Sequence, residues 1–144
     1  MTDSVILSRL RRFLLALATV LCIGTVAELA LEEHFQDAIQ YVPFVLCALG
    51  LAALVLAQVR PMRRTILALQ AVMVLLALGG ALGVYEHLVH NIAFELDIRP
   101  NAGMSDVILD ALMGASPLLA PGALTVVAAV AAAATYRHPG LSTD

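Results

Sequence analysis

Four long apolar stretches constrain the fold of this chain more than any other feature of its sequence. Each has about 20 residues, the length a helix needs to cross the hydrocarbon core of a bilayer. Only helices and closed barrels satisfy all backbone polar groups in lipid, and none of the stretches alternates polar with apolar residues as a barrel strand would. The sequence therefore predicts an all-α integral membrane protein, a four-span helical bundle forming one membrane domain over residues 1–144. The stretches run roughly over Phe13–Leu31, Val42–Val59, Thr65–Val84 and Leu118–Tyr136.

The charged residues predict how the bundle lies in the membrane. The chain has no Lys, and seven of its eight Arg residues flank the spans on one side: Arg9, Arg11, Arg12, Arg60, Arg63, Arg64 and Arg137. The positive-inside rule then predicts that both termini are cytoplasmic, and we expect a bacterial inner membrane. Nine of the eleven acidic residues fall on the opposite, outer side, which favours cations and argues against nucleic acid as a partner.

An internal repeat indicates how the spans are related. The segment Glu33–Asp37 (Glu-His-Phe-Gln-Asp) recurs 53 residues later as Glu86–His90 (Glu-His-Leu-Val-His), and the same offset superposes Arg11 on Arg64. In each copy the Arg-to-Glu separation is ~33 Å on a helix, about one bilayer thickness. We expect two parallel helical-hairpin repeats, residues 9–61 and 62–139, related by an axis along the membrane normal.

The first and third helical patterns are longer than a bilayer is thick. They run from about Arg9 to Gln40 and from about Thr65 to Glu95, so ~10–15 Å of each helix should project outward. The second repeat also has an outer-loop insertion at about 96–120. There Ser105 can cap a short amphipathic helix, and we expect this helix to lie on the membrane surface or to cover the projecting ends. Its apolar face comprises Val107, Ile108, Ala111 and Leu112.

The repeated Glu-His segments are the best candidates for a binding site. Residues three and four apart share a helix face, so two adjacent helices would bring both segments together. Mixed His and carboxylate ligands suit Zn, Fe, Mn, Ni or Co. The predicted metal set is His34, Asp37, His87 and His90, with Glu33 and Glu86 as direct or outer partners. A structural network of interfacial polar side chains, or a site for protons or a small ligand, remains an alternative for the same residues.

A second polar feature lies on the first span. Glu28 lies 17 residues after Arg11, at the outer edge of the hydrocarbon, and Glu32 follows on the same helix face. The two carboxylates could form a polar path for cations, or Glu28 could be an interfacial charge or an ion-pair partner of Arg99. On the third span, Gly79 and Gly83 are spaced for close helix packing, which fits a single bundle better than a homodimer.

The sequence has no phosphate-binding loop, haem-attachment motif or nucleophile elbow, so we expect neither haem nor nucleotide, and an enzyme is the least favoured class. The predicted function is divalent transition-metal binding by the outward-facing cluster, for handling, sensing or delivery. The alternative is a non-catalytic accessory or assembly subunit of a larger membrane complex, docked through Asp106 and Asp110. The first span also resembles a signal peptide with a cleavage site near Thr25–Ala27. We expect the span to be retained, because cleavage would leave the second repeat without its partner.

Overall fold

The computed structural model describes residues 3–141, and all of its regular elements are helical. The three helices α1, α2 and α3 are long and apolar enough to cross a membrane, and α5 is a shorter apolar helix. This confirms the all-α prediction and the apolar helices on which the membrane assignment rests. The helices are α1 (Asp3–Leu31), α2 (Tyr41–Val59), α3 (Arg63–Ile98), α4 (Met104–Leu112) and α5 (Leu119–Thr135), and two 3₁₀ turns are η1 (Ala38–Gln40) and η2 (Pro139–Leu141).

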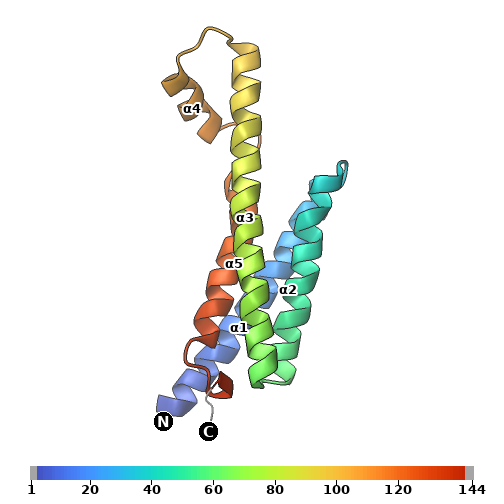
Figure 1. The fold of residues 1–144 in the computed structure, drawn as a ribbon, viewed down its shortest axis with the longest axis vertical. Helices are drawn as coiled ribbons and strands as arrows, with labels where there is room; N and C mark the ends of the chain where they lie inside the picture. The colour runs from blue at the N-terminus through green and yellow to red at the C-terminus, as the bar shows by residue number, and fades with distance from the viewer. Residues whose placement is uncertain (1–2, 142–144) are drawn as a thin grey trace.

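The four apolar helices form a ring of neighbours. Helix α1 packs against α2 and α5, and α3 packs against the same two helices (Figure 1). The first turns of α1, the α2–α3 connection and the end of α5 lie together at one end of the bundle. That end carries the clustered arginines and is called the basic end below. The α1–α2 connection and α4 lie toward the opposite, acidic end.

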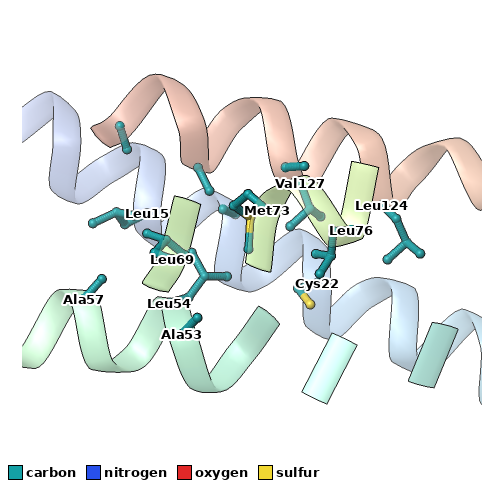
Figure 2. Close-up of a cluster of buried hydrophobic side chains, with 14 of the residues drawn as sticks. Leu15, Cys22, Ala53, Leu54, Ala57, Leu69, Met73, Leu76, Leu124 and Val127 are labelled. Atoms are coloured by element: carbon teal, nitrogen blue, oxygen red, sulfur yellow. The ribbon is translucent and has the colours of Figure 1, made fainter. Parts of the chain in front are cut away.

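The core is built from leucines on all four apolar helices, and α5 adds several small residues. Figure 2 shows Leu15, Leu54, Leu69 and Leu124 pointing inward from α1, α2, α3 and α5, and all four are buried. Helix α5 also buries Ala128, Ala131 and Ala134. Small side chains let helix backbones approach closely, and van der Waals packing of this kind holds helices together where lipid already surrounds them.

Side chains of α2 and α5 pack directly on glycines of α3. Leu46 of α2 packs on Gly79, and Pro121 of α5 packs on Gly83. A methyl group added at Gly80 would lie 3.0 Å from the carbonyl oxygen of Pro121. The glycine pair predicted from the sequence is therefore used inside this bundle, by two different helices.

Near the basic end, one side-chain hydrogen bond links α1 to α2 and another links α3 to α5. Gln58 on α2 donates from Nε2 to the hydroxyl of Thr19 on α1, at 3.1 Å. Gln70 on α3 donates from Nε2 to the hydroxyl of Thr135 on α5, also at 3.1 Å. Hydrogen bonds between helices satisfy polar side chains that would otherwise face hydrocarbon.

Helix α1 ends at Leu31, nine residues before the predicted end at Gln40, and this part of the prediction is wrong. Its end is a Schellman motif, because the His34 N–H donates to the Leu29 carbonyl (2.9 Å) and the Glu33 N–H donates to the Ala30 carbonyl (3.2 Å). Glu33 takes the left-handed conformation that this motif requires, with φ of 49°. The chain must reverse before α2 begins at Tyr41, and a straight helix to Gln40 leaves no residues for that reversal.

Helix α3 has 36 residues, about 54 Å at helical rise, and extends well beyond the other helices (Figure 1). Helix α4 packs against this extension, which is one of the two placements that the amphipathic pattern left open. It buries Val107 and Ala111, whereas Ile108 and Leu112 are exposed, so the buried face is narrower than predicted. The N-cap residue is Gly103 and not Ser105.

Candidate metal site at the acidic end

Two of the predicted ligands, His34 and His87, approach each other at the acidic end. Their ring centroids are 6.4 Å apart and the ring planes are inclined by 54°. His34 lies in the turn directly after α1, where the Schellman motif places it, and His87 lies on α3. Both side chains are partly buried. The two copies of the repeated Glu-His segment therefore meet through their histidines.

A backbone carbonyl orients the His87 ring. Its Nδ1 lies 2.9 Å from the carbonyl oxygen of Pro117, in the connection between α4 and α5. A carbonyl oxygen only accepts hydrogen bonds, so Nδ1 carries the proton and Nε2 of the neutral ring keeps its lone pair. Metal-binding histidines commonly have this arrangement, in which an outer partner sets both tautomer and ring orientation.

The surroundings of His34 keep its imidazole neutral. Burial lowers the pKa of His34 below its ordinary value of 6.5, and the electrostatic effect of the neighbouring His87 ring lowers this pKa further. Neutral imidazole is the form that binds a metal, because a proton and a metal ion compete for the same lone pair. His34 is therefore in its ligand form at neutral pH.

The other predicted ligands do not join this pair. Glu33 occupies the left-handed position at the end of α1, Asp37 precedes η1, and both are exposed. Glu86 and His90 are exposed on α3. Within residues 3–141, no three His, Cys, Asp or Glu side chains are grouped so that they could hold one metal ion. Because α1 ends before His34, the shared helix face predicted for His34 and Asp37 does not form.

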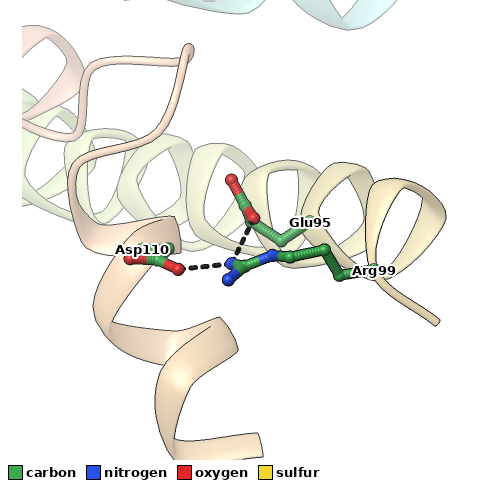
Figure 3. Close-up of polar contacts among 3 residues, drawn as sticks. All are labelled: Glu95, Arg99 and Asp110. Atoms are coloured by element: carbon green, nitrogen blue, oxygen red, sulfur yellow. Dashed lines mark hydrogen bonds and ion pairs between the residues drawn. The ribbon is translucent and has the colours of Figure 1, made fainter. Parts of the chain in front are cut away.

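Arg99 pairs with carboxylates at the end of α3 and on α4, and not with Glu28. Its Nη2 lies 2.7 Å from Oε2 of Glu95 and also contacts Oδ2 of Asp110 (Figure 3). The ion pair joins the end of α3 to α4, so Asp110 serves a contact within the chain. Asp106, the other predicted docking residue, is exposed, as are Glu28 and Glu32 on the α1 side.

Asn91 holds the outer loop against α3, a role that the sequence analysis did not assign. Its side chain is buried, and its Nδ2 donates to the carbonyl oxygens of Ala111 and Ser116, both at 2.9 Å. The Ser116 N–H donates back to Oδ1 of Asn91, at 2.9 Å. These bonds place Pro117 beside His87. In the sequence, the only hint of this role is that Asn91 is an uncharged amide close before the loop insertion at about 96–120.

The chain matches no protein-family model, no curated protein sequence and no solved structure.

Proposed function

We propose that this protein is a four-span membrane protein, with both termini cytoplasmic, that binds a divalent transition metal at its outer, acidic end through His34 and His87. The approach of these two rings is the observation that carries the proposal. With a metal–nitrogen bond of ~2.1 Å, two imidazoles on one tetrahedral ion have ring centres about 5 Å apart. The two ring centroids are 6.4 Å apart, so the rings need to approach by only about 1 Å to bind one metal ion.

The proposal takes further support from the neighbouring side chains. The Nε2 atom of His87 is free to bind because Nδ1 donates to Pro117. His90 follows His87 by three residues on α3, but its side chain is exposed and is not grouped with the two rings. Water completes the coordination of such a site, which suits an ion that is handed on and not held permanently. Handling, sensing or delivery of Zn, Fe, Mn, Ni or Co is the function that follows.

Elemental analysis of the detergent-purified protein, prepared without a His tag, tests this function. We expect near-stoichiometric metal in the wild type and its loss in a folded His34→Ala/His87→Ala variant. The matched control is His138→Ala, which removes a histidine at the basic end and should retain the metal. If the wild type binds none of these five ions after equilibration with each of them, the metal function is rejected.

Exposed apolar side chains on α4 favour a second candidate function, that of an accessory subunit. Leu109 is 62% exposed and Met113 is 87% exposed, on a segment that packs outside the four-helix ring. Apolar surface in such a place is typical of a contact with another protein. If this function holds, the wild type co-purifies from native membranes with a larger complex, and Leu109→Asp loses that complex while keeping any bound metal.

A further inference from the structure

Two apolar grooves run along the outside of the bundle near its basic end. One lies between α1 and α5, has a volume of about 320 Å³ and is lined by Leu7, Leu10, Leu14 and Ala133. The other lies between α2 and α3, has a volume of about 300 Å³ and is lined by residues that include Leu49, Leu56 and Val72. Both grooves open on helix faces that would meet lipid, because α1, α2 and α3 are long and apolar enough to cross a membrane.

The α1–α5 groove has a cluster of basic and aromatic groups at its end. Arg11 and Arg137 both line it, together with Tyr136. Arg11 is partly buried as a residue, and its guanidinium donates from Nη2 to the carbonyl oxygens of Arg137 (2.9 Å) and Tyr136 (3.4 Å). The Arg137 guanidinium carbon lies 5.6 Å from the centre of the Tyr136 ring. Two positive charges therefore converge where the apolar lining ends.

A turn with a left-handed residue holds this cluster in place. The His138 N–H donates to the Thr135 carbonyl at 3.1 Å, and Arg137 has a φ of 46°. Tyr136, with φ of −59° and ψ of 123°, has the geometry of the residue before glycine in a type II turn. Arg137 thus takes a position at which glycine is normally favoured. The turn directs its side chain back over Tyr136.

We propose that the α1–α5 groove binds one phospholipid with an anionic headgroup. An acyl chain lies on Leu7, Leu10 and Leu14, and the headgroup phosphate contacts the guanidinium groups of Arg11 and Arg137. Charge complementarity selects this occupant, because the planar guanidinium matches the geometry of a phosphate and an apolar groove below it matches a lipid chain. Basic residues at a membrane surface attract anionic lipids in the same way. The site is independent of the proposed metal function at the other end.

The α2–α3 groove supplies a matched comparison. Its basic residue is Arg64, which stands 53 residues after Arg11 in the sequence repeat. Its lining contains one arginine, whereas the α1–α5 groove has two arginines and a tyrosine. We therefore expect the anionic lipid to bind more tightly in the α1–α5 groove.

Native mass spectrometry of the detergent-purified protein, with added phosphatidylglycerol or phosphatidylcholine of the same chain length, tests the site. We expect wild-type protein to retain one phosphatidylglycerol preferentially. Arg137→Gly should weaken that binding about five- to tenfold and leave phosphatidylcholine binding unchanged. Glycine suits the left-handed backbone at this position, so the variant loses the charge without straining the turn.

Two further variants separate the groove from general surface charge. Ala133→Leu fills the α1–α5 groove without changing charge and should weaken both lipids. Arg64→Gln removes one charge at the same end of the bundle and should reduce phosphatidylglycerol binding less than Arg137→Gly does. The proposal is overturned if the two lipids bind equally, if the two arginine variants have equal effects, or if Ala133→Leu changes nothing. It is also overturned if inorganic phosphate alone protects the wild type from thermal unfolding as well as phosphatidylglycerol does.

Discussion

Asn91 and Ser116 exchange two hydrogen bonds, each of 2.9 Å, across the interface between α3 and the α4–α5 connection. A side-chain amide has both a donor and an acceptor, as a peptide group has, so it can pair with the N–H and C=O groups of a backbone segment. The third bond, from Nδ2 to the Ala111 carbonyl, attaches the end of α4 to the same side chain. One residue of α3 is therefore bonded both to the end of α4 and to the connection that follows it.

Replacement of this amide by a carboxylate should release the insertion. In Asn91→Asp, a buried carboxylate would face the carbonyl oxygens of Ala111 and Ser116 with no proton to donate, at a cost of about 3 kcal/mol. Hydrogen exchange of the α4 amides should accelerate while exchange in α1 and α2 is unchanged. The control Ala93→Asp adds the same charge at an exposed position of α3 and should leave α4 protected. Equal protection of α4 in both variants would refute this role.

The left-handed residue at the end of α1 gives a second prediction. Non-glycine residues pay about 1 kcal/mol in this conformation, so Glu33→Gly should be neutral or stabilise the protein by up to ~1 kcal/mol. Glu33→Val should destabilise it by about 1 kcal/mol, because a β-branched residue tolerates this conformation poorly. Thermal unfolding in detergent measures both. If Glu33→Gly also lowers metal content, Glu33 is a ligand as well as a helix terminator.

Close packing of α3 on α5 should not tolerate a side chain at Gly80. A methyl group there would lie 3.0 Å from the Pro121 carbonyl oxygen and 3.1 Å from the Thr125 backbone nitrogen, so the helices would have to separate. We expect Gly80→Ala to destabilise the bundle by about 1–3 kcal/mol. Gly24→Ala on α1 is the control, since a methyl group there meets nothing within 4 Å. It should be neutral or stabilising, because alanine favours a helix more than glycine does.

The lowered pKa of His34 predicts a dependence of stability on pH. An unfolded chain has the ordinary histidine pKa of 6.5, so on acidification it binds the His34 proton before the folded protein does. The fold therefore loses stability as pH falls from about 6.5 through the lower pKa of folded His34, and His34 has no such effect at higher pH. Acid should also release bound metal over the same range.

NMR titration of the His34 ring protons in the metal-free protein measures this pKa directly. We expect a midpoint below 6.5 in the wild type. In His87→Ala the midpoint should rise only part of the way, because burial is the larger cause and the electrostatic effect of His87 the smaller. His138→Ala, at the opposite end, should leave the His34 midpoint unchanged. A wild-type midpoint at or above 6.5 would contradict the environment described for His34.

The elements that could be predicted from the sequence are those that local pattern determines. Apolar length alone indicated the long helices. The apolar spacing after Ser105 indicated the amphipathic helix α4, although only Val107 and Ala111 of its four predicted face residues are buried. The end of α1 was harder to predict, because apolar periodicity carries no information about where a left-handed residue will stop a helix. Glycine is the usual residue at such a position, so a glutamate there did not indicate a helix end.

The sequence by itself determined that the chain forms long apolar helices with basic residues grouped at one end and acidic residues at the other. Length, hydropathy and charge are properties of local stretches of sequence, and they do not depend on how the helices pack against one another. Only the tertiary structure decided which polar groups meet: His34 with His87, Asn91 with Ser116, and Arg11 with the turn at Arg137. These partners are 25 to 126 residues apart along the chain, so their contact depends on how the helices pack and not on any local pattern.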